Sequence, residues 1–218
     1  MKNYPFSFDQ LKNFSESNPY LDLNDLDSKL LAYLKSKCSE LNFPAVTDDI
    51  GNFLRFLTFL IKPKRIFEFG SGYGQSAFWY LKGYSDLEKI YLCEKRDDLE
   101  EVFNDAPWSE AYREKLDYFR GDAFDRLKTV DRIDLFLVDG VKADYLRFLK
   151  ECRGKLNKGG VVAIDNSYWR GSFLDETLSE TKKSAKNIKE LHEFIKNSDQ
   201  WDAVFIPFVD GLTLLRAI

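Results

Sequence analysis

Two predicted strands end in acidic side chains that could hold a metal ion. Asp139 follows an apolar run that ends at Val138, and Asp165 and Asn166 follow a second run that ends at Ile164. Short apolar runs are typical of buried parallel strands, whose carboxyl ends form the ligand-binding edge of an open α/β sheet. Two carboxylates and an amide oxygen suit a hard cation, with Mg²⁺ favoured and Mn²⁺ or Ca²⁺ as alternatives. We therefore predict a divalent-metal site here, although Asp-Asn pairs also serve as helix caps and turns.

A glycine-rich turn after an earlier predicted strand is the second candidate ligand site. Glycines occupy positions 70, 72 and 74, and a predicted helix follows them. Glycine permits unusual dihedral angles and lets the backbone approach a ligand closely. A dinucleotide site would have a third glycine where this chain has Gln75. The turn therefore predicts ligand binding of another kind, and a tight turn needed only for packing is the alternative.

Three acidic residues near this turn indicate what the ligand carries. Glu68, two residues before Gly70, suits an ammonium group and a sulfonium charge better than a pyrophosphate. Glu94 ends the next predicted strand, where an acid can bind a pair of ribose hydroxyls. Asp122 follows the third strand, from which it would reach the edge of an adenine.

The predicted elements alternate as expected for a doubly wound α/β sheet. A helix capped by Asn24 or Asp25 and a second one that starts at Thr47 or Asp48 precede the sheet. The tight turn Asp210-Gly211 predicts an antiparallel hairpin at the end of the chain. We expect strands at 65–69, 89–94, 117–120, 133–138, 161–164, 203–207 and 212–216, and helices at 75–81, 98–104, 122–128, 142–156 and 184–196.

Length and composition fit one domain over residues 1–218, with residues 1–62 as an N-terminal helical cap. The 44% of hydrophobic residues suffice for a sizeable core. The net charge of −4 argues against a dedicated nucleic-acid binder, although residues 182–186 form a local basic patch. Three cysteines without C-x-x-C spacing, and no predicted signal peptide or membrane span, predict a soluble cytoplasmic protein with reduced thiols and no membrane partner.

Taken in order, these motifs resemble the cation-dependent branch of the S-adenosylmethionine-dependent O-methyltransferases. That branch includes the catechol and caffeoyl-CoA O-methyltransferases and many bacterial relatives. The resemblance covers the chain from about Phe43 onward and implies the seven-stranded, Rossmann-like sheet of class I methyltransferases. The segments that carry it are 43–46 (FPAV), 68–76 (EFGSGYGQS), 139–142 (DGVK), 165–171 (DNSYWRG) and 210–212 (DGL).

The resemblance implies a role for individual residues. Asp139, Asp165 and Asn166 would hold the metal, and Lys142 would be the catalytic base. Trp169 would line the substrate pocket, although a lone aromatic residue can equally be core packing. The implied contacts to S-adenosylmethionine are Val46, Glu68, Gly70, Gly72, Ser76, Glu94, Asp122, Ala123 and Asp139.

Two departures from the family pattern concern the cofactor loop and the substrate. A tyrosine is more usual where Gln75 stands, and no clear C-terminal carboxylate matches the one with which animal catechol enzymes hold a second hydroxyl. His192, the only histidine, lies on a predicted helix face, where we expect an exposed side chain. We expect Trp108 to pack a loop.

The leading hypothesis is methyl transfer to a metal-chelated hydroxyl of a small, catechol-like aromatic substrate. Lys142 could then act as a base, since burial and a nearby cation lower the pKa of a lysine. The alternative within the family is methylation of 5-hydroxyuridine in tRNA. Outside the family, the same sheet could belong to a nicotinamide-dependent oxidoreductase or to a catalytically silent cofactor-binding module. The family also predicts a homodimer that forms through the N-terminal helices.

Overall fold

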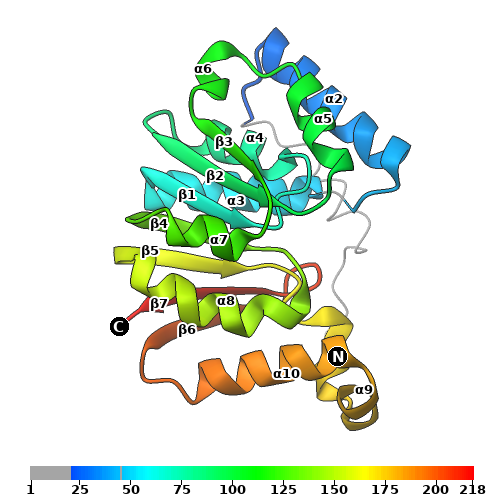
Figure 1. Ribbon diagram of the computed structural model, residues 1–218, viewed down its shortest axis with the longest axis vertical. Helices are drawn as coiled ribbons and strands as arrows, with labels where there is room; N and C mark the ends of the chain where they lie inside the picture. The colour runs from blue at the N-terminus through cyan, green and yellow to red at the C-terminus, as the bar shows by residue number, and fades with distance from the viewer. Residues whose placement is uncertain (1–20, 45) are drawn as a thin grey trace, which may run out of the picture.

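The computed structural model describes residues 21–44 and 46–218, in which one mixed sheet is the centre of the fold (Figure 1). Its strand order is β3-β2-β1-β4-β5-β7-β6. The first five strands in this order are parallel, and β7 pairs antiparallel with both β5 and β6. The strands are β1 (Arg65–Phe69), β2 (Lys89–Glu94), β3 (Leu116–Arg120), β4 (Ile133–Val138), β5 (Leu156–Ile164), β6 (Trp201–Ile206) and β7 (Leu212–Ala217). The predicted fold class is confirmed.

Helices cover both faces of the sheet, as the doubly wound pattern predicts. Helices α2, α3 and α4 pack on one face, and α7, α8 and α10 on the other. The α-helices are α2 (Asp25–Leu41), α3 (Asp48–Ile61), α4 (Gln75–Gly83), α5 (Asp98–Asp105), α6 (Glu110–Arg113), α7 (Ala123–Lys128), α8 (Tyr145–Cys152), α9 (Glu176–Thr181) and α10 (Lys183–Lys196). Three 3₁₀ segments are η1 (Lys142–Asp144), η2 (Arg153–Lys155) and η3 (Trp169–Leu174).

The N-terminal helices begin at the predicted caps. The Asn24 side chain accepts a hydrogen bond from the backbone of Asp27, and Thr47 does the same for Ile50. These bonds satisfy amides that would otherwise lack a partner in the first turn. Residues 1–20 of the predicted helical cap lie outside the described residues, and so does Ala45 of residues 43–46, called here the entry segment.

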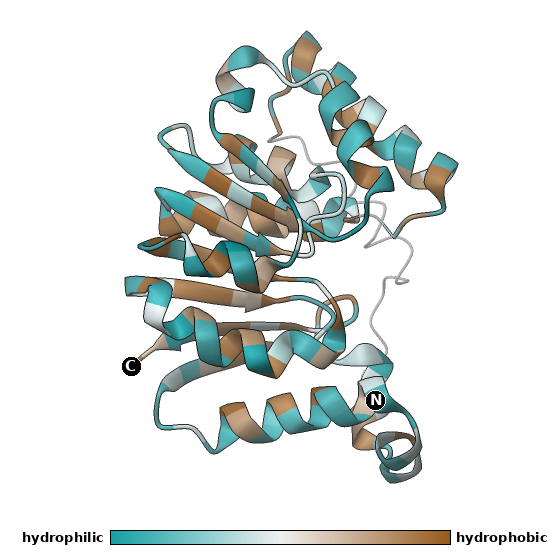
Figure 2. Cartoon of the chain, viewed as in Figure 1, coloured by the Kyte–Doolittle hydropathy of each residue, from teal (hydrophilic) through white to brown (hydrophobic). Residues whose placement is uncertain are grey.

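Strand alternation divides the core into two clusters. Along β4, Leu135 and Leu137 lie in the cluster beneath α3 and α4, whereas Phe136 and Val138 lie in the one beneath α7, α8 and α10. Figure 2 shows the sheet as the most hydrophobic part of the chain, between helices whose outer surfaces are polar. This double burial explains why the strands read as continuous apolar runs.

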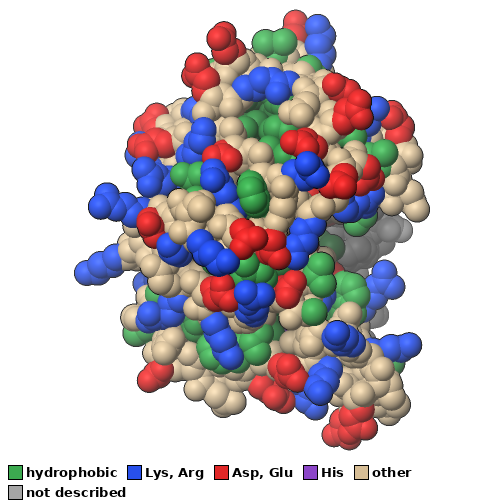
Figure 3. Space-filling model, viewed as in Figure 1, with side chains coloured by type: hydrophobic (Ala, Val, Ile, Leu, Met, Phe, Trp, Pro, Cys, Tyr) green, Lys and Arg blue, Asp and Glu red, His purple; other side chains and the backbone are tan. Residues whose placement is uncertain are grey.

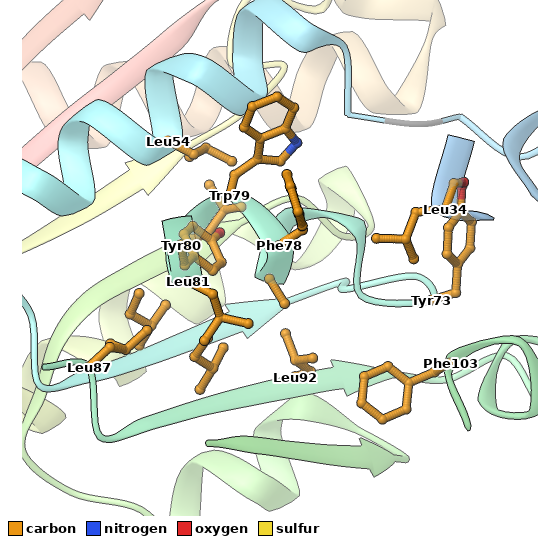
Figure 4. Close-up of a cluster of buried hydrophobic side chains, with 14 of the residues drawn as sticks. Leu34, Leu54, Tyr73, Phe78, Trp79, Tyr80, Leu81, Leu87, Leu92 and Phe103 are labelled. Atoms are coloured by element: carbon orange, nitrogen blue, oxygen red, sulfur yellow. The ribbon is translucent and has the colours of Figure 1, made fainter. Parts of the chain in front are cut away.

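Aromatic side chains pack between the N-terminal helix α3 and the helix α4, which covers the sheet (Figure 4). Trp79 of α4 is buried beside Leu54 of α3, and a Cβ at Gly51 would lie 2.1 Å from its ring. Glycine is therefore required near the start of α3 despite its poor helix propensity. Trp108 packs its loop as expected, since its indole N–H donates to the Phe103 carbonyl at 3.1 Å.

The expected helix at 142–156 is wrong in its extent. Two 3₁₀ segments flank a shorter α8, and β5 already begins at Leu156, five residues before the predicted strand. The first part of β5 is partly exposed, and its pairing with β4 shifts register between Ile133 and Leu135. Residues 157–160 (NKGG) are typical of turns, so the sequence pattern did not reveal this irregular extension. Among the described residues, no helix is sufficiently long and apolar to cross a membrane.

Candidate active site

The glycine turn brings the ends of β1 and β4 into contact. Gly70 has a positive φ of 88°, and a Cβ there would lie 2.6 Å from the Asp139 carbonyl oxygen. The amides of Gly70 and Ser71 both donate to the Cys93 carbonyl at 3.0 Å, which fixes the turn against β2. Glycine is needed for its backbone conformation and for the close approach. The turn therefore lies directly beside the first residue of the predicted metal site.

Replacing Gly70 with alanine is expected to damage the site more than the same change at Gly159. Both glycines have a positive φ, 88° and 83°, but within residues 21–44 and 46–218 no atom lies within 4 Å of a Cβ at Gly159. Gly159→Ala should therefore show only the conformational cost, about 1–2 kcal/mol. Gly70→Ala must also push the β1 and β4 ends apart, so we expect a larger loss. Thermal unfolding measures both, and equal destabilisation would contradict the close-approach argument.

Glu68 is a buried carboxylate in the floor of the cavity at this turn. Its side chain is 2% exposed, and the Ser76 hydroxyl lies 2.6 and 2.5 Å from its two oxygens. Burial raises the pKa of Glu68 to about 8, and the negative charges of Asp139, Glu94 and Asp165 add to this effect. A positively charged ligand group beside Glu68 would stabilise the ionised carboxylate and so lower its pKa again.

Glu94 and Asp122, the other two predicted acids, are engaged in local hydrogen bonds. Glu94 accepts from the amide of Gly72 at 2.9 Å and from those of Lys95 and Arg96. Asp122 caps α7 through the Phe124 amide and forms an ion pair with Lys95 at 3.0 Å. Glu94 lines the cavity described below. Asp122 does not line it, although the adjacent residues Gly121 and Ala123 do.

A cavity of about 1180 Å³ joins the glycine turn to the ends of β4 and β5. Part of its wall is Phe43 of the entry segment, whose ring would lie 2.8 Å from a Cβ at Gly72. The predicted residues that line the cavity are Val46, Glu68, Gly70, Gly72, Ser76, Glu94, Ala123, Asp139, Lys142, Asp165 and Asn166. The structure thus brings together every predicted site residue except Asp122.

Lys142 lies among the predicted metal ligands. Its Nζ donates to the Asn166 Oδ1 at 3.1 Å and to the Tyr145 hydroxyl at 2.6 Å, and it lies 3.8 Å from the Asp139 Oδ1. Burial lowers the pKa of Lys142, while the surrounding carboxylates oppose that change. Burial also raises the pKa of both Asp139 and Asp165, and their mutual repulsion raises that of Asp139 further.

The chemistry of these donors fits a hard cation. Within residues 21–44 and 46–218, no three His, Cys, Asp or Glu side chains form a metal-binding group. The candidate set instead combines two carboxylates with the Asn166 amide, all oxygen donors of the type that Mg²⁺ prefers. The half-buried Asp139 and the buried Asp165 repel each other, and the cation beside them is Lys142, 3.8 Å from Asp139. A divalent ion would therefore supply positive charge that this part of the site needs.

Polar atoms without partners indicate that the glycine turn also takes a ligand. The Ser71 hydroxyl is buried and has no hydrogen-bond partner among the described residues, and Ser71 lines the cavity beside Glu68. Buried polar groups are nearly always hydrogen-bonded, so an unpaired one facing a cavity indicates a missing partner. A cofactor with hydrogen-bonding groups and a positive charge fits this wall.

Tyr145 and Asp210 are two residues of the cavity region whose place at the site was not predicted. Tyr145 is fully buried, and its hydroxyl donates to the Asp165 carbonyl at 3.2 Å, so it links Lys142 to the metal-site turn. Asp210 lies on the cavity wall and accepts a hydrogen bond from the Arg170 amide. In the sequence, Asp210 is marked only as a residue of the hairpin turn, because no local sequence pattern indicates that this hairpin lies beside the site. Trp169 also lines the cavity, with Lys142 Nζ 5.3 Å from its ring centroid.

The expectation that His192 is exposed is wrong. Its side chain is 4% exposed, and its Nε2 lies 2.7 Å from the Ser167 carbonyl oxygen. Ile188 and Ile195, four residues before and three after, are buried on the same face of α10. That helical spacing was the available signal, because it places His192 on the apolar stripe.

Comparison with known proteins identifies the family. The O-methyltransferase family model matches residues 23–218. The chain belongs to the O-methyltransferase family. Among relatives of this O-methyltransferase, caffeoyl-CoA O-methyltransferase 1 of Eucalyptus globulus is 25% identical over 187 residues, which are 81% of this chain and 76% of the relative. The caffeoyl-CoA O-methyltransferase of Pinus taeda is 26% identical and covers 81% of this chain and 73% of its own length. The resemblance found in the motifs is confirmed.

Solved structures share the fold of this O-methyltransferase. The SAH-bound methyltransferase PaMTH1 of Podospora anserina superposes with a TM-score of 0.80 at 20% identity, covering 100% of this chain and 99% of its own. The O-methyltransferase TomG of Streptomyces achromogenes, solved in complex with SAM, has a TM-score of 0.79 at 23% identity and covers 94% of both chains. At these identities the likeness supports the sheet and its helices alone.

Proposed function

We propose that this O-methyltransferase transfers a methyl group from S-adenosylmethionine to a metal-chelated hydroxyl of a small, catechol-like aromatic substrate. The proposal rests on one observation: a single cavity contains two separate groups of ionisable side chains, one at the glycine turn and one at the ends of β4 and β5. The buried Glu68 lies beneath the glycine turn, and the Asp139, Asp165 and Lys142 cluster lies next to it. The Gly70–Asp139 contact holds these two groups together, so a cofactor and a substrate bound at them would be neighbours.

Two bound groups would supply chemistry that the side chains lack. S-adenosylmethionine supplies a methyl group already activated on a sulfonium, and Glu68 and Ser71 would bind its charged and polar parts. A divalent cation held by Asp139, Asp165 and Asn166 would lower the pKa of a nearby substrate hydroxyl. Those three residues would then orient the substrate oxygen toward the glycine turn.

Lys142 is positioned to take the hydroxyl proton. Its side chain is 10% exposed, and burial lowers its pKa toward the range in which a lysine can act as a base. The Tyr145 hydroxyl at 2.6 Å and the Asn166 oxygen at 3.1 Å fix the ammonium at the cavity wall. Trp169 would limit the access of water to this proton transfer.

The comparisons and the charges favour a small substrate. The Eucalyptus and Pinus relatives carry the name caffeoyl-CoA O-methyltransferase, and TomG was solved with SAM. Acidic side chains outnumber basic ones on the cavity wall, and Figure 3 shows Lys and Arg interspersed with Asp and Glu over the visible face. Binding to an RNA backbone requires a continuous basic surface.

Methyl incorporation from labelled S-adenosylmethionine tests the proposal. The purified protein is incubated with a panel of vicinal aromatic diols and, separately, with total tRNA. We expect label in the diols, on oxygen, and none in tRNA above the level of a heated sample. Label in tRNA alone would replace the small-substrate proposal with the RNA alternative. Binding of NADH without binding of S-adenosylmethionine would contradict the cofactor.

We also propose a homodimer that forms through the N-terminal helical region. On α3, the exposed Phe56 and Phe59 rings stack on each other at 6.3 Å, and Leu60 lies beside them in sequence at 60% exposure. An apolar surface of this kind is typical of an interface with another protein chain.

Replacing Phe56 and Phe59 together with serine should turn the dimer into a monomer. Each substitution removes an aromatic ring from the proposed interface without disturbing a buried residue. Light scattering coupled to size-exclusion chromatography measures the mass. Leu174→Ser in η3, where leucine is 75% exposed, is the control and should leave the dimer intact. A wild-type monomer at micromolar concentration would refute the interface.

A reducing, cytoplasmic compartment fits the three cysteines. Cys38, Cys93 and Cys152 are all free, and Cys93 and Cys152 are buried. Burial raises the pKa of both buried thiols, so they stay protonated and unreactive.

A further inference from the structure

The His192 imidazole reaches the segment that directly follows the proposed metal ligands. Its Nε2 lies 2.7 Å from the carbonyl oxygen of Ser167, the residue after Asn166. A carbonyl can only accept, so Nε2 carries the proton and donates it. Burial among aromatic rings lowers the pKa of His192, which favours the neutral ring with a single N–H.

Ser167 is fully buried and makes three hydrogen bonds, two with the terminal hairpin and one with α10. Its amide donates to the Gly211 carbonyl at 2.9 Å, and its hydroxyl accepts from the Thr213 hydroxyl at 2.9 Å. His192 of α10 supplies the third contact, to the carbonyl. Asn166, immediately before it, has a positive φ of 49°, in the left-handed region that Asn adopts more readily than other residues with a side chain. The contacts to Ser167 therefore fix the backbone directly after Asn166 in one arrangement.

The same imidazole supports the segment that forms the far wall of the cavity. It stacks on Phe173 of η3 with ring centroids 4.5 Å apart and an interplanar angle of 16°. Trp169 and Arg170, at the start of η3, line the cavity and both have positive φ angles, 46° and 56°. One side chain thus contacts both the turn that carries Asp165 and Asn166 and the wall above it.

We propose that His192 is a positioning residue that holds the Asp165–Asn166 turn and the η3 wall together in one fixed arrangement. His192 does not line the cavity, so it acts on substrate and metal only through these two segments. The role deepens the proposed function and rests on it where metal and substrate are concerned. The restraint on the backbone itself does not depend on that function.

Hydrogen exchange at the turn tests the restraint directly. His192→Phe keeps a ring that can stack on Phe173 but removes the donor to Ser167. We expect the amides of Ser167, Tyr168 and Trp169 to exchange at least about tenfold faster, because the carbonyl loses its partner. The control is Ile195→Val, which removes a methyl group from the same buried face of α10 and should leave those amides unchanged. Equal exchange in the His192→Phe variant and the wild type would overturn the proposal.

Two further variants keep the test decisive if His192→Phe does not fold. His192→Gln retains an N–H donor and should restore much of the protection. Thr213→Val removes the hydroxyl that donates to Ser167 from β7, so it should loosen the same amides from the other side. If the amides exchange fast in His192→Gln but stay fully protected in Thr213→Val, hydrogen bonds to Ser167 do not hold the turn. The His192 ring would then only fill space, which would overturn the proposal.

Binding of Mn²⁺, followed by its electron paramagnetic resonance signal, links the restraint to the site. We expect His192→Phe to weaken binding about tenfold, as losses of outer-shell partners do, while Ile195→Val binds like the wild type. Unchanged binding in His192→Phe would refute positioning of the ligands. A wild-type protein that binds no Mn²⁺ and methylates no diol would refute the proposed function, and the exchange result would still decide the restraint.

Discussion

Replacing Lys142 with alanine is expected to lower kcat for methyl transfer by about 10²–10⁴-fold, the usual contribution of a general base. The dissociation constant of S-adenosylmethionine should stay within about twofold of the wild-type value. Lys142 lies beside Asp139 and Asp165, whereas the cofactor is expected at the other end of the cavity, beside Glu68. Rapid-quench assays with labelled cofactor measure the first quantity, and calorimetry the second.

Lys150→Ala is the matched control for this prediction. Lys150 is an exposed lysine on α8, and its Nζ lies 4.9 Å from the Phe194 ring centroid, so its loss removes the same charge away from the cavity. Its kcat should equal that of the wild type. A Lys142→Ala enzyme that keeps more than a tenth of the wild-type kcat would assign the proton transfer to another group.

Replacing Glu68 with glutamine is expected to change cofactor binding and stability in opposite directions. Glutamine cannot supply the negative charge that Glu68 would carry beside a bound cationic cofactor. S-adenosylmethionine should therefore bind about 10–100-fold more weakly, because a hydrogen-bonded charge pair of about 1.5–3 kcal/mol is lost. Calorimetric titration at pH 8 measures this effect. Glu88→Gln is the matched control, because Glu88 is exposed, does not line the cavity and forms an ion pair with Lys64 at 3.5 Å. It removes the same charge away from the site and should bind the cofactor like the wild type.

The effect on stability has a definite sign. Burial raises the pKa of Glu68 from an ordinary 4.5 to about 8, so the folded protein holds a proton that the unfolded chain has released across that range. Folding stability without cofactor should therefore fall as the pH rises from 4.5 to 8. Glu68→Gln should gain up to about 4 kcal/mol over the wild type at pH 8, and almost nothing at pH 4.5. Identical pH profiles would contradict the buried, protonated carboxyl.

Local patterns predicted the elements that are buried on both faces. The structure reproduces the predicted strands at Arg65–Phe69, Lys89–Glu94 and Ile133–Val138 without a shift. Each of these runs is mostly apolar because helices cover both sides of it. The early start of β5 and the short helices α6 and α9 escaped prediction, since their residues have weak propensities and depend on contacts with other parts of the chain.

The residues of the candidate site likewise fall into those that a local sequence pattern marks and those that depend on tertiary contacts. Asp139, Asp165 and the glycine turn could be predicted because strand ends and glycines mark them in the sequence. The places of Tyr145 and Asp210 at the site could not, because each depends on which elements meet in space. Helical spacing indicates that His192 is buried, but not that it contacts Ser167. No local pattern indicates that α10 lies beneath the Ser167 segment. The roles of all these residues stay predictions until variants are measured.

Metal dependence is the most direct test of the account. The protein is freed of metal with EDTA, assayed with labelled S-adenosylmethionine and a vicinal aromatic diol, and titrated back with Mg²⁺. We predict that EDTA removes most methyl transfer, that Mg²⁺ restores it, and that Asp139→Ala stays inactive at saturating Mg²⁺. Full methyl transfer in excess EDTA would contradict the account.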